Sequence, residues 1–242
     1  EPALKLIIQR MPATLELALF SLFIAIVFGI PLGIYAGLKP KSKVSKTIMA
    51  GSILGFSMPT FWVGIIFIMI FAVHLGWLPS TGRGELGTFL GIQSSLFTAN
   101  GLSHVFLPAL NLALFKMSSV IRLTRAGTRE IILQDYITFA RSKGLSEEKV
   151  VLVHVLRNIL IPIVTVIGLE FGSLIAFSTV TETIFAWPGM GKLIIDSIYN
   201  LDRPVIVAYL MIIVTFFVFL NLLVDILYSL LDPRVRVKGA NE

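Results

Sequence analysis

The chain has 242 residues, of which 56% are hydrophobic and only 14% charged, with a mean hydropathy of +0.89 and a formal net charge of +6. Soluble domains carry about 25% charged residues, so this composition excludes an ordinary soluble protein and indicates a bilayer. The net positive charge does not indicate nucleic-acid binding, because the basic residues lie between apolar runs rather than on a polar surface. The chain has no Cys, which excludes disulfides and thiolate metal sites.

Five apolar runs approach or exceed the length of about 20 residues that a membrane helix needs. The expected spans, all in one domain covering residues 1–242, are about 12–38, 47–75, 105–125, 159–181 and 204–231. Lys116 interrupts the third run and Glu170 interrupts the fourth. Strand-like alternation is absent, so the predicted fold is an all-α, polytopic helix bundle.

Small residues recur every four positions in three of these runs, which predicts close helix–helix contacts. These residues are Ala25, Gly29, Gly33 and Gly37, then Gly51 and Gly55, then Gly168, Gly172 and Ala176. Pro31 and Pro59 are expected to kink their helices, and Ser57 to satisfy freed backbone groups.

The distribution of basic residues predicts the orientation. Most of the 20 Lys and Arg residues lie in segments 39–46, 116–157 and 234–238. The positive-inside rule places these segments and the C-terminus in the cytoplasm, and residue 1 outside. Because the sequence begins with Glu and shows no signal peptide with a cleavage site, we expect an N-terminal piece to precede it.

A polar segment, DYITFARSKGLSEEKVVLVHVLRNILIP (135–162), separates the third and fourth runs. Asp135 is expected to cap a short helix that ends at Gly144, and Ser146 to cap a second one. One face of the first helix holds residues at helical spacing: Tyr136, Phe139, Ala140 and Lys143. This face is suited to docking on another protein, and a solvated loop is the alternative that spacing leaves open.

The segment resembles the cytoplasmic loop of the inner-membrane permease subunits of ABC importers, in which an Ala, a Gly four residues later and a Pro recur. Ala140, Gly144 and Pro162 hold these positions, and the long step from Gly144 to Pro162 is similar to that of the dipeptide, oligopeptide and nickel subgroup. The stretch FAWPGMG (185–191) resembles a second element of this subgroup. In that subgroup it belongs to a re-entrant loop near the external gate, here residues 182–203.

The resemblance implies a bundle of the type I ABC importer permease kind, in a prokaryotic inner membrane, with a coupling loop at 126–158 and one more helix upstream. It also implies the partners: a second homologous permease subunit, two ATP-binding subunits and an extracytoplasmic solute-binding protein. ATP and Mg would be bound by the partner ATPase, with no cofactor or metal in this chain. The residues implied to couple to the ATPase are Asp135, Tyr136, Thr138, Phe139, Ala140, Arg141, Lys143 and Gly144.

Ionisable groups inside a membrane cost about 2.5–3.5 kcal/mol each and mark functional positions. Glu170 is therefore the first candidate for the translocation pathway, and an ion pair with Lys116 is the alternative. Glu182 is expected to shape the gate or contact the binding protein, and Trp187 to lie at the water–lipid boundary. The full set of candidates for the pathway or its gate is Glu170, Glu182, Asn111, Trp187, Pro188 and Gly189.

No catalytic pattern such as HExxH, GxSxG or GxxxxGK[ST] is present, so we expect a non-enzymatic subunit whose ATP is hydrolysed by another chain. The predicted function is to form half of the pathway for peptides delivered by a binding protein. Nickel chelates and oligosaccharides are alternative cargoes. From other classes, an ion-gradient-driven secondary transporter predicts inverted repeats and broken helices, and the sequence shows no repeat between its halves. A membrane scaffold leaves the polar groups of the fourth run unexplained.

Overall fold

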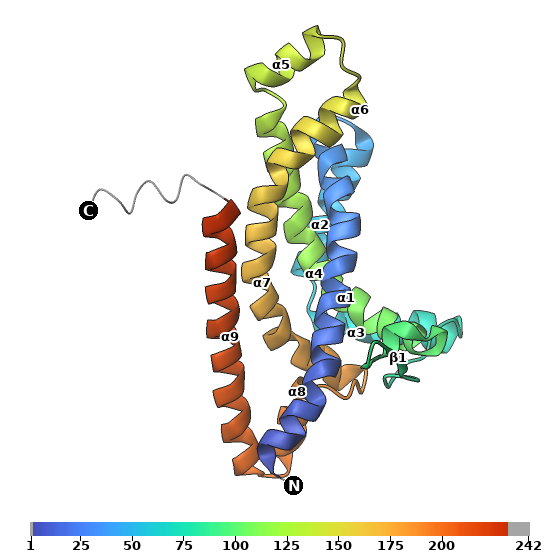
Figure 1. Ribbon diagram of the computed structural model, residues 1–242. Helices are drawn as coiled ribbons and strands as arrows, with labels where there is room; N and C mark the ends of the chain where they lie inside the picture. The colour runs from blue at the N-terminus through green and yellow to red at the C-terminus, as the bar shows by residue number, and fades with distance from the viewer. Residues whose placement is uncertain (1, 232–242) are drawn as a thin grey trace, which may run out of the picture.

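Residues 2–231, described by a computed structural model, form a bundle of long helices with smaller elements at its two ends (Figure 1). The long helices are α1 (Ala3–Leu38), α4 (Ala99–Ile131), α7 (Leu156–Ile184) and α9 (Arg203–Leu231). One end, the α5 end, carries α5 (Asp135–Ser142), α6 (Glu147–Lys149) and the π-helical η3 (Val150–Val155). The opposite end, the α8 end, carries α8 (Met190–Tyr199). The all-α prediction is confirmed, apart from one small β-hairpin.

The number of membrane crossings agrees with the predicted five at its upper limit. Within the described residues, α1, α4 and the Arg203–Val224 part of α9 are each long and apolar enough to cross alone. Two further crossings result if each of two bent helix pairs is one span. The basic tail used to predict orientation, 234–238, lies outside the described residues.

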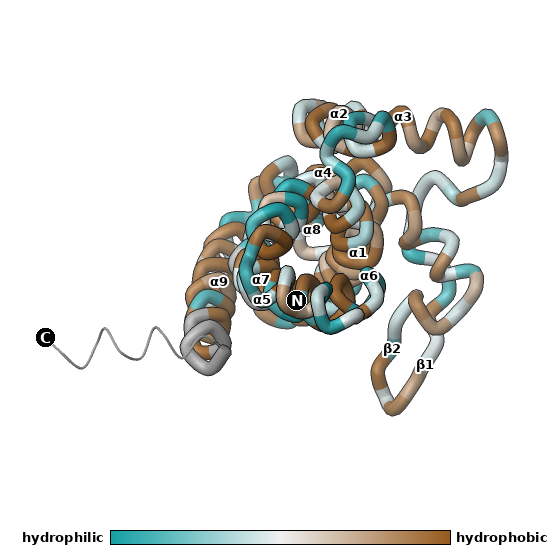
Figure 2. Tube along the Cα trace, turned by 90° about the horizontal axis from the view of Figure 1, so that it is seen from above, coloured by the Kyte–Doolittle hydropathy of each residue, from teal (hydrophilic) through white to brown (hydrophobic). Residues whose placement is uncertain are grey.

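The span expected at 47–75 bends sharply in its middle. α2 (Lys43–Ser57) and the following α3 (Thr60–Phe67) with the π-helical η1 (Ile68–His74) meet at 107°. Pro59 has no N–H to continue the α2 ladder, and it forces Met58 into an extended conformation with ψ of 137°. The kink predicted at Pro59 is confirmed, and Figure 2 shows α3 leaving the bundle sideways.

The small residues of α1 form its contact with α4. Gly29, Gly33 and Gly37 lie against Val120, Thr124 and Thr128, respectively. A Cβ added at Gly33 would come within 2.5 Å of the Thr124 Cβ, so a larger side chain would force the two backbones apart. The close contact predicted from this spacing is therefore confirmed.

The glycines of α7 play the same role toward α9. A Cβ at Gly168 would lie 2.9 Å from Val224, and one at Gly172 would lie 2.7 Å from Phe217. Gly51 differs, because nothing lies within 4 Å of its added Cβ in the part of the chain that the structure describes. Its predicted helix contact is thus not formed among the described residues.

The connection from η1 to α4 contains the hairpin. β1 (Gly87–Phe89) pairs antiparallel with β2 (Ile92–Ser94), and the 3-10 turn η2 (Ser95–Phe97) follows. The Thr98 hydroxyl then accepts a hydrogen bond of 2.9 Å from the Gly101 N–H. This cap starts α4 at Ala99, earlier than the predicted residue 105, and α4 ends at Ile131, later than predicted.

Candidate functional site

The short helix α5 lies at one tip of the molecule (Figure 1). Gln134, rather than the predicted Asp135, precedes the first helical residue, and no side chain caps it. The other two local predictions are confirmed. Gly144 has a φ of +78°, the left-handed conformation that ends a helix, and the Ser146 hydroxyl accepts from the Lys149 N–H.

The inner face of α5 is fixed by apolar contacts. Ile137 and Ala140 are buried in a cluster with Val150, Val155 and Ile159 of the following elements. Helical spacing predicted that Ala140 lies on the same outward face as Tyr136 and Phe139. This prediction is wrong, because Ala140 is only 5% exposed. The positions of η3 and α7 decide which side of α5 is buried, and these positions cannot be predicted from helical spacing.

The outer face of α5 leaves two aromatic side chains uncovered. Tyr136 is 44% and Phe139 is 60% exposed, and the Lys143 ammonium lies 4.6 Å from the centre of the Phe139 ring. The remaining predicted coupling residues are also exposed: Asp135, Thr138, Arg141, Lys143 and Gly144. A large uncovered aromatic pair held on a fixed helix is typical of a protein-docking surface.

Arg141 is committed to a partner within this chain. Its Nε and Nη2 donate to the two carboxylate oxygens of Glu147 at 2.7 and 3.2 Å. The pair joins α5 to α6 across the turn at Gly144. Arg141 therefore holds the shape of the tip, whereas Tyr136 and Phe139 are exposed.

Glu170 forms an ion pair with Lys116, which was the alternative to a role in the translocation pathway. Its Oε2 lies 2.9 Å from the Lys116 Nζ, which also donates to the Ser173 hydroxyl at 2.8 Å. The Ser119 hydroxyl donates to the other carboxylate oxygen at 3.2 Å. The Lys116 side chain is 6% exposed and that of Glu170 is 32% exposed, so the pair links α4 to α7 and keeps one open side.

Asn111 is buried between helices. Its Nδ2 donates to the Thr181 hydroxyl at 3.0 Å, joining α4 to α7. A Cβ at Gly64 would lie 3.3 Å from the same nitrogen, so α3 closes over this position. With 2% of its surface exposed, Asn111 does not line an open path in this structure.

Glu182 is fully buried and binds three parts of the chain together. Its Oε1 accepts from the hydroxyls of Thr14 (2.7 Å) and Ser178 (3.0 Å), and its Oε2 accepts from the Lys192 N–H (3.0 Å). Lys192 lies in the first turn of α8, where a carboxylate satisfies free N–H groups and the helix dipole. This burial argues against the expected contact of Glu182 with a binding protein, because the carboxylate fastens α7, α8 and α1 to one another. Its other expected role, shaping the gate, stays a prediction.

The turn WPGMG follows the same pattern. Trp187 is 0% exposed, and its Nε1 donates to the Ala13 carbonyl at 2.9 Å, so its predicted place at the water–lipid boundary is wrong. Gly189 is buried, and any Cβ there would overlap the Glu182 carboxylate. Pro188 is half-buried, and its carbonyl accepts from Arg10 at 3.5 Å.

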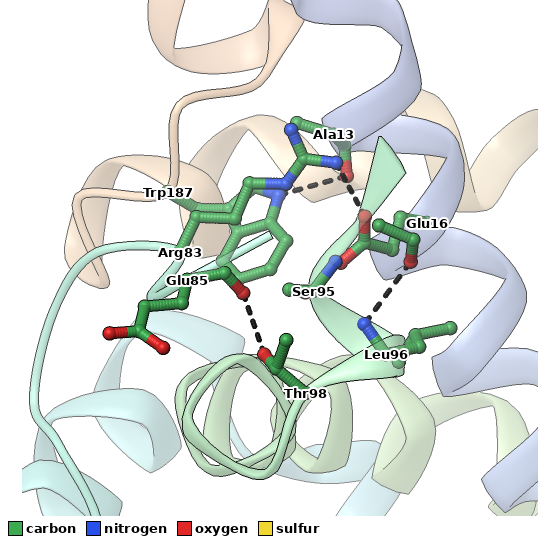
Figure 3. A network of polar contacts seen from close by, with 9 residues as sticks. Ala13, Glu16, Arg83, Glu85, Ser95, Leu96, Thr98 and Trp187 are labelled. Carbon is green, nitrogen blue, oxygen red and sulfur yellow. Dashed lines mark hydrogen bonds and ion pairs between the residues drawn. The ribbon is translucent and has the colours of Figure 1, made fainter. Parts of the chain in front are cut away.

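A second buried carboxylate, Glu16, binds the hairpin segment, residues 83–95, to α1 (Figure 3). Glu16 forms an ion pair with Arg83 and accepts from both the N–H and the hydroxyl of Ser95. The Arg83 guanidinium also lies 5.9 Å from the centre of the Trp187 ring. One turn of α1, residues 13–16, thus holds both the hairpin segment and the WPGMG turn. Sequence reasoning missed this network, although Glu16 in an apolar run and Arg83 in a weakly charged loop were its visible signals.

Comparison with known proteins decides the family. The family described as "Binding-protein-dependent transport system inner membrane component" matches residues 29–237. The chain belongs to this family. It is accordingly a multi-pass membrane protein and a permease subunit of an ABC importer, as the coupling-loop and WPGMG resemblances predicted.

Members of the family with high identity to this permease are peptide transport proteins by name. The di/tripeptide transport system permease protein DppB of Pseudomonas aeruginosa (strain UCBPP-PA14) is 43% identical over 93% of this chain and 70% of its own length. The oligopeptide transport system permease protein AppB of Bacillus subtilis (strain 168) is 41% identical over 97% and 72%. The dipeptide transport system permease protein DppB of Escherichia coli (strain K12) is 37% identical over 96% and 73%.

Solved structures agree on the fold of this permease. An inward-facing structure of the MetNI methionine ABC transporter matches with a TM-score of 0.74 at 18% identity, covering 96% of this chain and 99% of that one. An amino acid ABC transporter crystallised with histidines matches with a TM-score of 0.63 at 15% identity, covering 93% and 94%. The predicted type I permease fold is confirmed.

Proposed function

We propose that this permease forms half of the translocation pathway for peptides that an external solute-binding protein delivers, with ATP hydrolysed by separate subunits. In this proposal a second homologous permease subunit completes the pathway, and two ATPases bind at the α5 end. That end and the C-terminus lie in the cytoplasm, and the α8 end faces outward, as the distribution of basic residues indicates.

The observation that carries the proposal is the uncovered Tyr136–Phe139 face on a helix whose other face is fixed. A docking helix has to transmit force, and α5 meets this need because Ile137 and Ala140 join it to Ile159 and Ile163 of α7. Ile30 and Ile34 of α1 lie against the same cluster. A push on α5 is therefore delivered to helices that continue to the opposite end of the bundle.

The mechanism that follows is a two-state switch biased by nucleotide. Closure of the ATPases moves α5 and the helices joined to it, and the bundle changes between inward-open and outward-open cavities. The WPGMG turn is clamped to α1 through Ala13 and Thr14, so movement of α1 carries the turn with it. No step of this mechanism requires a catalytic group in this chain.

Peptides are the proposed cargo because the relatives described above are named for di-, tri- and oligopeptide transport. Nickel chelates and oligosaccharides are the competing cargoes. The reconstituted complex with its binding protein tests all three through the ATPase rate. We expect stimulation by peptides alone; stimulation only by a nickel chelate or an oligosaccharide would contradict the assigned cargo.

The ion-gradient-driven secondary transporter is not supported, because the chain belongs to a binding-protein-dependent family. The 107° break between α2 and α3 resembles the discontinuous helices of such carriers, but Pro59 accounts for it.

A further inference from the structure

A cavity of about 220 Å³ lies at the α2–α3 bend, between this bend, α4 and α7. Met58 and Thr60 line it from the bend, Phe115 and Lys116 from α4, and Phe177 from α7. Met58 and Phe177 are exposed and mark its mouth, whereas Lys116 is buried in its wall. The cavity is therefore largely apolar and open on one side. Among the described residues that line it, Lys116 alone is charged.

Lys116 has hydrogen-bonding capacity to spare. An ammonium group has three N–H donors. Glu170 and Ser173 accept two of them in the described part of the chain, at 2.9 and 2.8 Å. A third donor on a buried cation favours an anionic acceptor, because charge-assisted hydrogen bonds are about twice as strong as neutral ones.

The bend adds to this preference. Thr60 is the first residue of α3, so the positive end of that helix lies at the cavity wall. Discontinuous membrane helices place such ends toward anionic groups of a solute. The helix end by itself would not define a site; here it lies at the same cavity as the buried ammonium.

We propose that this cavity binds the C-terminal residue of the transported peptide, with the carboxylate on Lys116 and an apolar side chain between Phe115 and Phe177. The inference rests on the proposed peptide import. The cavity is smaller than the roughly 300–1,000 Å³ of a typical ligand pocket, so it fits one residue rather than a whole peptide. Glu170 already neutralises Lys116, which disfavours phosphate and other multiply charged anions.

Photolabelling of the assembled transporter in nanodiscs, without binding protein, tests the site directly. The probe is a dipeptide whose C-terminal residue is a diazirine analogue of leucine, used with a free carboxylate and as the amide. We expect the carboxylate probe to label residues 58–60 or 174–177 about tenfold more than the amide, the factor that one charged hydrogen bond supplies. Equal labelling by the two probes, or labelling elsewhere only, would overturn the proposal.

Variants assign the preference to Lys116. Lys116→Gln should reduce carboxylate labelling to the level of the amide, and Lys116→Arg should retain most of it. Lys192→Gln, at the α8 end and paired with Asp196, is the matched control and should change nothing. Phe177→Ala, at the exposed mouth, should lower labelling by both probes and keep their ratio. A carboxylate preference that survives Lys116→Gln would show that a group other than Lys116 supplies it and would overturn the proposal.

ATP-driven peptide uptake, measured on the same preparations, separates this inference from the proposed function. If the wild-type complex imports peptides but labelling ignores the carboxylate, the subsite is rejected and peptide import stands. If the wild-type complex imports no peptide and only another cargo is taken up, the proposed function itself fails.

Discussion

The two ends of the molecule use their polar and aromatic residues in opposite ways. At the α8 end, Glu16, Glu182 and Trp187 are buried and bonded to partners in the same chain. At the α5 end, Tyr136 and Phe139 are exposed on a helix whose other face is already fixed. The sequence motifs at both ends resemble functional elements of the same family, yet Glu182 and Trp187 are buried at the α8 end, whereas Tyr136 and Phe139 of α5 are exposed.

This difference separates residues that build a functional element from residues that contact something outside the chain. A buried charge is tolerated only when hydrogen bonds satisfy it. The hydrogen bonds of Glu182 therefore indicate that α1, α7 and α8 are held rigidly together. An exposed aromatic pair has no such internal purpose and reports an interface. Substitutions should therefore lower stability at the α8 end and lower partner binding at the α5 end.

The largest effect is expected from Glu182→Ala. The change leaves the Thr14 hydroxyl and the Lys192 N–H without their acceptor in a buried place, which costs about 3 kcal/mol or more. The midpoint of thermal unfolding in detergent should fall accordingly. Glu85→Ala, at an exposed carboxylate near Arg83, is the control and should be within about 0.5 kcal/mol of wild type. An unchanged midpoint for Glu182→Ala would contradict the claim that the buried carboxylate stabilises the α8 end.

Ala140→Asp comes next, and it tests the buried side of α5. A carboxylate beside Ile137 and Val150 has no partner there, so α5 should detach from η3 at a cost of about 2 kcal/mol. Backbone hydrogen exchange of residues 135–142 should rise, and capture of the ATPase should be lost as a consequence. Ser142→Asp, on the exposed side of the same helix, should leave the exchange as it is. Slow exchange in Ala140→Asp would show that this face is not held by the cluster.

Thr14→Val is a smaller change at the α8 end. The substitution keeps the shape of the side chain but removes the hydroxyl that donates to Glu182 and accepts from the Met190 N–H. We expect a loss of about 1–2 kcal/mol, measured by the same thermal unfolding, since both partners are buried. Thr183→Val, whose hydroxyl bonds only to its own helix at an exposed position, is the control. A loss equal to that of the control would show that the clamp between α1 and α8 contributes nothing.

The smallest effect is expected from Arg141→Ala. Its ion pair with Glu147 is exposed, so its contribution to stability should lie below about 1 kcal/mol and decrease at high salt. The unfolding midpoint at low and high salt measures this contribution. A large loss that is independent of salt would mean that the α5–α6 turn depends on Arg141 far more than its exposure indicates.

The features that the sequence predicts are those decided by neighbours along the chain. The spacing of Gly33 and Gly37, the turn at Gly144 and the kink at Pro59 depend on local backbone geometry and were predictable. The Thr14–Glu182 and Glu16–Arg83 contacts join residues 168 and 67 positions apart, and no local pattern contains such a pairing. Ala140 shows the limit most clearly, because helical spacing groups residues on a face without saying which part of that face is buried.

The most direct test of the difference between the two ends is one double variant, Tyr136→Ala/Phe139→Ala, measured twice. Its unfolding midpoint and its capture of the ATPase subunit are compared with those of Tyr199→Ala, which removes an exposed aromatic at the α8 end. We predict an unchanged midpoint for both variants and lost capture for the double variant alone. Retained capture, or a midpoint that falls as in Glu182→Ala, would contradict the claim that α5 presents a partner-binding face.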